Sequence, residues 1–544
     1  MSLCARSLSL STTCRKTALR QYHHLRNARP RGLPRLGARI ILVAGVATTT
    51  AFAFSRLGPS DVYVDTGDDA DVEDSCIRNV PLTSLLRSYI VFSACSVPAF
   101  VDWSPHIISF MTSVPGLKQL AGALVRRSFF AQFVGGDTVA DCIPVIHRLR
   151  SESKGSLLVY SVEVDETKAG IVGNTSHSQM VEEVIHSIDA IADYEDSLST
   201  TAERSTWVAI KLTALLPDSQ ALVRLSQYLV RSRPSSSIPF PGSSTPQDLD
   251  ILTPSEDSPS LSSTDRIALR NLQVDLFRIC QRAKERQVKV AVDAEYSWYQ
   301  PAVDAYTAAL SKTFNSLSTD GSLQPIVYGT YQTYLRRGRS HLFQSLKDAE
   351  NGNYALGVKL VRGAYHEQET APNFRVSISP EAAPPVYLTK AETDASFNDC
   401  ARTLVDRISL DAHQNSQPRI SVLFGTHNAE SCRLIVSLLE REGLAKADPL
   451  HRTVCIPRST ALRISFGQLF GMRDMLTDHL AARIKSPTPV VFKYIPYGEL
   501  SEVMPYLSRR AIENKSVLGN GTALAELQRI RSEIRRRILS CFSS

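Results

Sequence analysis

The chain has 544 residues, of which 43% are hydrophobic, and its formal net charge is +7. This composition excludes a fibrous or wholly disordered protein and provides enough apolar residues for one large core or two modest ones. Residues 1–60 contain ten Lys or Arg and no Asp or Glu, so residues 61–544 carry a net charge of −3. Because a chain without a basic stripe has little with which to neutralise phosphates, we expect no nucleic-acid binding.

The first 39 residues are rich in Arg, Ser and Leu. This composition is typical of a mitochondrial presequence, and a disordered basic tail is the alternative. Ile40–Phe54 is an apolar run shorter than the roughly 20 residues that a membrane-spanning helix needs. We therefore expect a presequence over residues 1–55, with a tethering helix as the less favoured reading of the apolar run. The ten cysteines contain no Cys-x-x-Cys pair, so no metal site or disulfide framework is predicted.

Residues 61–150 are expected to be a linker followed by helices. Asp61–Ser75 is acidic and polar, whereas Ile77–Arg150 has apolar residues at helical spacing. The stretch 231–265 is dominated by Ser, Pro, Thr and Asp, which predicts a disordered surface insertion.

Eight short apolar runs follow, separated by longer helical stretches. Such runs are typical of buried parallel strands, because crossover helices cover both faces of the sheet. Eight strand–helix units favour a (β/α)8 barrel over residues 151–525, with an open doubly wound sheet as the alternative. The expected strands are Leu157–Val164, Trp207–Thr213, Val288–Asp293, Pro325–Tyr331, Leu356–Val361, Ile420–Gly425, Ile464–Leu469 and Pro489–Tyr494.

Polar side chains gather where these strands end, which is where barrel enzymes place their active sites. Lys211 places a positive charge in an apolar strand, so it must be paired or face a polar cavity, although it could also extend to the rim. Asp293 ends the next strand, and Tyr331 with Gln332 and Gln468 with Leu469 end two others.

Two later strand ends combine a glycine with polar groups. Lys359-Leu-Val-Arg-Gly-Ala-Tyr365 contains two cations and a glycine that would let the backbone approach a flat ring or a phosphate. Phe424-Gly-Thr-His-Asn428 offers a hydroxyl, an imidazole and an amide, although a lone histidine is more often structural.

The strongest pattern lies after Tyr494, on a predicted helix. Tyr506, Arg509, Arg510 and Glu513 are spaced so that they share one helical face. Two guanidinium groups beside an aromatic ring can hold a carboxylate in a two-pronged manner. A solvated helix with an Arg–Glu pair is the alternative.

In their order along the chain, these segments resemble the proline dehydrogenase family from about Leu157 to Gly519. The segments that carry the resemblance are Ile210-Lys-Leu-Thr-Ala214, Val292-Asp-Ala-Glu295, Lys359–Tyr365, Gly425-Thr-His-Asn428, Leu469-Phe-Gly-Met472 and Tyr494–Asn514. The resemblance implies a (β/α)8 barrel that holds non-covalent FAD. It departs from bacterial members at Lys359, where they commonly have Arg, and at Gly329, where they commonly have a side-chain amide.

The resemblance also implies roles for individual residues. Lys211, Arg509 and Arg510 match residues that bind the proline carboxylate, and Glu513 matches one that orients an arginine. Asp293, Leu469, Tyr494 and Tyr506 match residues of the substrate pocket. The residues assigned to FAD are Tyr331, Gln332, Lys359, Val361, Arg362, Gly363, Ala364, Tyr365, Thr426, His427, Asn428 and Gln468.

The implied reaction is oxidation of L-proline to Δ1-pyrroline-5-carboxylate, with ubiquinone as the electron acceptor at the matrix side of the mitochondrial inner membrane. For the membrane contact the sequence offers a basic amphipathic tail at 526–544, which could equally pack on the barrel. The alternatives to this function are a hydroxyproline dehydrogenase, another flavin barrel oxidoreductase and an inactive mitochondrial scaffold.

Overall fold

A computed structural model describes most of the chain from residue 77 onward. The described residues are 77–78, 80–97, 117–161, 177–198, 204–232, 244, 246–253, 261–317, 325–371, 384–413, 418–518 and 522–542. The expected presequence at 1–55, with its apolar run, and the expected linker at 61–75 lie outside these residues.

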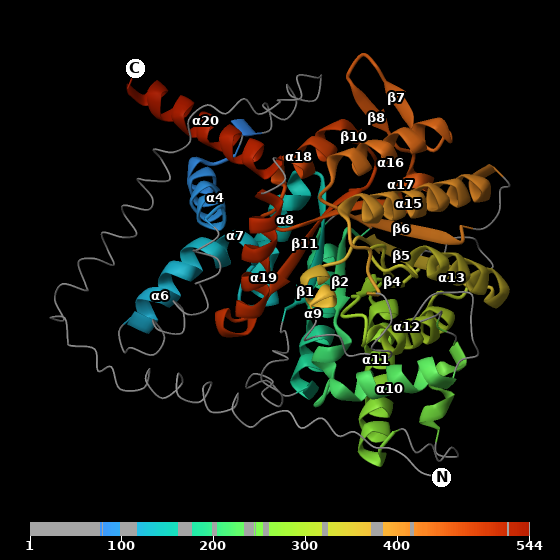
Figure 1. Cartoon of the computed structure of the whole chain (residues 1–544). Helices are drawn as coiled ribbons and strands as arrows, with labels where there is room; N and C mark the ends of the chain where they lie inside the picture. The colour runs from blue at the N-terminus through green and yellow to red at the C-terminus, as the bar shows by residue number, and fades with distance from the viewer. Residues whose placement is uncertain are drawn as a thin grey trace, which may run out of the picture. The chain divides into compact units, whose positions relative to one another are not determined.

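Eight parallel strands close into a barrel, which confirms the predicted fold class (Figure 1). Their order around the barrel is β1-β11-β9-β6-β5-β4-β3-β2. Closure comes from β1 and β11, which pair over seven residues from Lys154 opposite Val491 to Tyr160 opposite Tyr497. The strands are β1 (Lys154–Tyr160), β2 (Thr206–Ile210), β3 (Val290–Val292), β4 (Val327–Gln332), β5 (Leu356–Val361), β6 (Ile420–Gly425), β9 (Ile464–Leu469) and β11 (Val491–Tyr497).

Helices surround the barrel because one face of every strand must be covered to bury its apolar side chains. The helices that follow successive strands are α9 (His177–Ser197), α10 (Gln220–Ser232), α11 (Ser263–Glu285), α12 (Gln300–Phe314), α13 (Gly338–Gly352), α14 (His366–Thr370), α15 (Lys390–His413), α16 (Ala429–Arg441), α18 (Asp474–Arg483) and α19 (Leu500–Leu518). Two large apolar clusters fill the space between these helices and the strands.

Aromatic side chains fill the barrel interior. Trp207 packs against Tyr328 and Phe492, with ring centroids 4.7 and 5.1 Å apart. These rings join Leu157 and Leu423 in a separate buried cluster. The interior is therefore a packed core, and it forms a floor beneath the carboxyl ends of the strands.

Within the stretch 231–265, expected to be a disordered surface insertion, residues 246–253 are described, whereas residues 233–243, 245 and 254–260 lie outside the described residues. Residues Pro246–Leu252 form the 3-10 helix η3, in which Leu249, Ile251 and Leu252 are buried, and it packs against α12. The Ser- and Pro-rich composition predicted disorder, but these three apolar residues are enough to hold a short helix against α12. Helix α11 already begins at Ser263, where Ser262 and Asp265 form a capping box.

The described residues before the barrel are largely helical. They include α4 (Leu82–Cys95), α6 (Leu117–Val125), the π-helix η1 (Arg126–Phe130), α7 (Ala131–Phe133) and α8 (Val139–Ser151). Among the described residues, no helix is both long and apolar enough to cross a membrane.

The C-terminal tail forms helix α20 (Thr522–Phe542), which packs against α4 and α19 (Figure 1). Leu527, Ile530 and Ile534 are buried together with Leu85 and Tyr89 of α4. Arg537 donates hydrogen bonds to the carbonyl oxygens of residues 77, 78 and 80. The tail was expected either to contact a membrane or to pack on the barrel. In the structure most of its apolar face is packed, whereas Ile538 and Leu539 at its end are exposed.

Candidate active site

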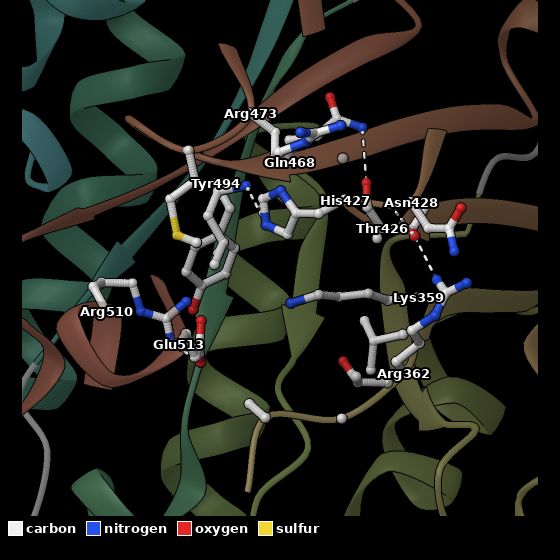
Figure 2. Close-up of a pocket in the computed structure, with 18 of the residues that line it drawn as sticks. Lys359, Arg362, Thr426, His427, Asn428, Gln468, Arg473, Tyr494, Arg510 and Glu513 are labelled. Carbon is white, nitrogen blue, oxygen red and sulfur yellow. Dashed lines mark hydrogen bonds and ion pairs between the residues drawn. The ribbon is translucent and has the colours of Figure 1, made fainter. Parts of the chain in front are cut away.

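The carboxyl ends of the barrel strands open into a cavity of about 870 Å³ (Figure 2). Because all eight strands are parallel, side chains from distant parts of the sequence meet at this one end. Every site residue predicted from the sequence lines this cavity, with the exception of Tyr331.

One end of the cavity is cationic. Helix α19 presents Tyr506, Arg509, Arg510 and Glu513 to it, as helical spacing predicted. Arg510 is only 3% exposed, forms a 2.6 Å ion pair with Glu513 and lies over the ring of Tyr506 at 4.9 Å. Lys211 reaches the same cavity from the end of β2. A buried arginine together with the half-buried Arg509 and Lys211 suits the binding of an anionic group.

Arg509 is placed by an aromatic side chain from another strand end. Its guanidinium lies 5.2 Å from the ring centroid of Tyr365, which follows β5. Tyr365 in turn packs against Tyr296, with ring centroids 4.2 Å apart. The loops after β3 and β5 thus hold one of the two arginines of α19.

Asp293 is the centre of a second group of contacts. Its carboxylate forms a 2.5 Å ion pair with Lys359 and accepts a 2.6 Å hydrogen bond from the hydroxyl of Tyr494. The Lys359 ammonium also lies 4.6 Å from the centroid of the Tyr494 ring (Figure 2). Burial, reinforced by Asp293, raises the pKa of Tyr494 well above its ordinary value, so this hydroxyl remains a hydrogen-bond donor.

His427 lies in the middle of the cavity wall. Burial lowers the pKa of His427 well below its ordinary value, and the charges of Lys493, Arg473 and Arg510 add to this effect, so the ring is neutral. Its Nε2 accepts a hydrogen bond of 3.5 Å from the backbone amide of Leu469, which leaves the proton on Nδ1. That buried Nδ1 has no hydrogen-bond partner among the described residues. It is therefore a donor available to a bound molecule.

The opposite end of the cavity lies at the start of helix α16 (Figure 2). Asn428 caps this helix by accepting from the amide of Ser431 at 3.1 Å. Arg362 donates to Thr426 at 2.5 Å and to Ser431 at 2.8 Å, and Arg433 and Lys390 also line this end. Asp394 pairs with both Arg362 and Lys390, and a helix N-terminus with cations around it suits the binding of phosphate groups.

Gly363 is required by the backbone at the end of β5. Its φ of +141° is a conformation that side chains disfavour, and a Cβ there would come within 2.5 Å of the Tyr334 ring. The chain therefore turns closely beneath the cavity at this point.

Two expectations about β4 need correction. Tyr331 does not line the cavity: it packs among the outer apolar residues and lies 5.1 Å from the ring of His341. Side chains alternate along a strand, so Thr330 and Gln332 face the cavity and Tyr331 faces away from it. Gly329 also faces outward, toward Thr307. A side-chain amide at position 329 would therefore point away from the cavity, and the amide that does line the cavity belongs to Gln332.

The structure adds cavity residues that the sequence did not indicate. Arg473 follows β9 and lies 3.5 Å from Glu526 of α20, and burial raises the pKa of Glu526 although Arg473 opposes this. Phe92 of α4 completes this wall. No motif signals these residues, because their positions depend on how α4 and α20 pack on the barrel. Further additions include Lys390, Glu430 and Arg433.

Comparisons with known proteins agree with this geometry. A family model described as proline dehydrogenase matches residues 145–521. Hydroxyproline dehydrogenase of Rattus norvegicus is 30% identical over 465 residues, which cover 84% of this chain and 91% of the relative. Proline dehydrogenase 2, mitochondrial, of Arabidopsis thaliana is 30% identical over 487 residues, which cover 87% of this chain and 91% of the relative.

Among solved structures, proline utilization A (PutA) from Bdellovibrio bacteriovorus, inactivated by N-propargylglycine, has a TM-score of 0.54 and 17% sequence identity. The similarity covers 89% of this chain and 43% of that protein, and it concerns the fold alone. The family model, by contrast, spans the barrel and the cationic face of α19. This chain therefore belongs to the proline dehydrogenase family.

Proposed function

We propose that this protein is a mitochondrial FAD-dependent oxidoreductase that acts on a CH–NH group and oxidises L-proline to Δ1-pyrroline-5-carboxylate. The observation that carries the proposal is that Lys211, Arg509 and Arg510 line one cavity in a chain of this family. Three cations in one cavity with the side chain of Leu469 and the ring of Tyr494 suit a small ring that bears a carboxylate.

The cavity residues fit FAD. The volume of about 870 Å³ can hold a cofactor of this size together with a small substrate. The buried Nδ1 of His427 is an available donor, and the buried Oε1 of Gln332 is an acceptor without a partner among the described residues, so both suit the polar edge of a flavin ring. The start of α16, with Arg362 and Arg433, suits the pyrophosphate. We expect Gly363 to allow close approach of the ring.

The residues of the chain bind and orient, and none need act as a nucleophile. A bound flavin supplies the redox chemistry by accepting hydride from the proline ring carbon next to nitrogen. Lys211, Arg509 and Arg510 hold the carboxylate, which fixes the distance and the angle of that carbon. Tyr494, kept in place by Asp293, and Leu469 cover the ring and exclude water.

We further propose that ubiquinone reoxidises the cofactor and that the protein contacts the matrix side of the inner membrane. Helix α4 exposes Leu86 and Ile90 on the side away from the core, and the end of α20 exposes Ile538 and Leu539 beside exposed arginines. Apolar and basic side chains together suit an anionic lipid surface. Phe92 of the same helix α4 lines the cavity, so an acceptor dissolved in the bilayer would reach the site beside α4.

Sedimentation with vesicles that contain anionic phospholipid tests this contact. A Leu86→Ser/Ile90→Ser variant should lose sedimentation with the vesicles. A control variant, Ile267→Ser/Val274→Ser, removes exposed apolar residues from α11 instead and should behave like the unmodified protein. Equal sedimentation of all three proteins would refute the role of α4.

The activity itself is tested by the visible spectrum of the purified protein. A flavin absorbance that bleaches when L-proline is added without oxygen, and returns with a quinone, is the expected result. A flavin that does not respond to proline would refute the substrate, and a colourless protein would refute the cofactor.

Hydroxyproline is the second candidate substrate. Relatives named hydroxyproline dehydrogenase and proline dehydrogenase both reach 30% identity with this chain, so identity does not distinguish them. Comparison of kcat/KM for L-proline and for 4-hydroxy-L-proline decides between them, and a larger value for the hydroxylated ring would overturn our first choice.

A further inference from the structure

Glu295 is a buried carboxyl group that the proposed reaction does not use. It follows Asp293 by two residues, is 5% exposed and does not line the cavity. Its side chain points to the segment after β2, where it accepts a 3.1 Å hydrogen bond from the amide of Thr213 and a short one from the Thr213 hydroxyl. Thr213 belongs to the 3-10 helix η2 (Leu212–Leu215), whose N-cap is Lys211. The carboxylate therefore holds the turn that carries Lys211.

The backbone of Glu295 makes two further contacts. Its amide donates to the side chain of Gln300 at 3.0 Å, and its carbonyl oxygen accepts from Gln332 at 3.0 Å. Gln332 lines the cavity, so Glu295 connects a cavity side chain of β4 with the turn that follows Lys211. This position is over-determined by four hydrogen bonds, which makes it a rigid support.

We infer that Glu295 is a positioning residue for the substrate carboxylate, which acts by holding the turn at Lys211 and by offsetting part of the Lys211 charge. This inference rests on the proposed function, because it concerns the anion that Lys211 is expected to bind. An ionised Glu295 lowers the positive potential at that end of the cavity, whereas a protonated one does not. Binding of a carboxylate is therefore stronger when Glu295 is neutral.

Charged groups from neighbouring elements affect the ionisation of Glu295. Lys211 at the end of β2 stabilises the charge of Glu295, and Asp293, directly after β3, opposes it. Asp293 is itself neutralised by Lys359 of β5. On the α12 side, Gln300 separates Glu295 from Asp304 by donating to Asp304 at 2.7 Å. Burial, the largest effect, raises the pKa of Glu295 to about 7. The two charge states thus interchange near neutral pH.

The test is the affinity of the flavin-loaded protein for cyclopentanecarboxylate, a ring carboxylate that cannot be oxidised at a CH–NH group. The dissociation constant is measured between pH 6 and 8.5 from the change in flavin absorbance. For the unmodified protein, we expect the dissociation constant to rise at least about threefold as Glu295 ionises, since its charge opposes the bound anion. Glu295→Gln should show a pH-independent constant close to the low-pH value.

A matched control is Glu369→Gln. Glu369 is a buried carboxylate that clamps another loop in the same way, by accepting from the amide of Ser297 at 2.7 Å and from its hydroxyl at 2.6 Å. This variant should keep the pH dependence. Thr213→Val should weaken binding at all pH values, and Thr213→Ser should restore it.

A pH dependence that survives in Glu295→Gln would overturn the inference. A dissociation constant that does not change with pH in the unmodified protein would also overturn the inference, and this measurement does not depend on the folding of any variant. Both outcomes are distinct from failure of the proposed function, in which the protein would lack flavin or would not oxidise proline.

Discussion

Substitution of Arg510 by Met tests the carboxylate site most directly. Arg510 is buried, and its guanidinium is paired with Glu513 and packed on Tyr506. Met has a similar unbranched stem and keeps much of the packing, but it removes the charge. A charge-assisted hydrogen bond to the substrate is worth about 1.5–3 kcal/mol, which corresponds to roughly a 12- to 140-fold change. We expect the KM for proline to rise by this factor.

Steady-state kinetics with proline and a soluble quinone measure the effect, after normalisation to bound flavin. The value of kcat should change less than KM, because we propose that Arg510 contacts the carboxylate and not the carbon that is oxidised. Arg126→Met is a suitable control, since Arg126 is an exposed arginine paired with Asp137 outside the cavity. A KM for Arg510→Met within twofold of the unmodified enzyme would refute the assignment of this residue.

Three further predictions concern the cofactor site and stability. Gly363→Ala should lower the ratio of flavin to protein absorbance, because its Cβ would collide with the Tyr334 ring. Asp304→Ala removes a 2.5 Å ion pair with buried Arg337 and should reduce the free energy of unfolding in urea by about 3–5 kcal/mol; a loss under about 1 kcal/mol would contradict a buried pair. Burial raises the pKa of Glu295 from 4.5 to about 7. Between these pH values the folded protein retains a proton on Glu295 that the unfolded chain has released. The contribution of this proton to the free energy of unfolding is therefore lost as the pH rises through this range. Glu295→Gln should remove that part of the pH dependence of the melting temperature.

The barrel could be predicted from the sequence because its strands are continuous apolar runs, and each predicted run contains an observed strand or most of one. The small sheet of β7 (Lys446–Asp448), β8 (Thr453–Cys455) and β10 (Ile484–Lys485) could not be predicted. Its strands have two or three residues and are partly polar, so they carry no periodic signal. Short strands of this kind depend on neighbouring segments that only the folded chain brings together.

The candidate site was predictable where a residue type and its spacing indicate chemistry. The shared face of Tyr506, Arg509, Arg510 and Glu513 follows from helical geometry alone. Tyr331 was misassigned because the end of a strand is known only to within a few residues, and a shift of one residue moves a side chain to the other face. The strand continues to Gln332, which is the residue that faces the cavity.

The cavity wall formed by α4 and α20 lies outside the region that matches the family model. The family model covers residues 145–521, so it includes the cationic end and the start of α16 but neither Phe92 nor Glu526. Both residues nevertheless line the same cavity, and Glu526 is held by its contact with Arg473 of the barrel. The residues that we propose to bind the carboxylate and the cofactor thus lie on the barrel and α19. Access to the cavity beside α4 depends on helices outside the matched region, which is where we expect differences in electron acceptor among related proteins to arise.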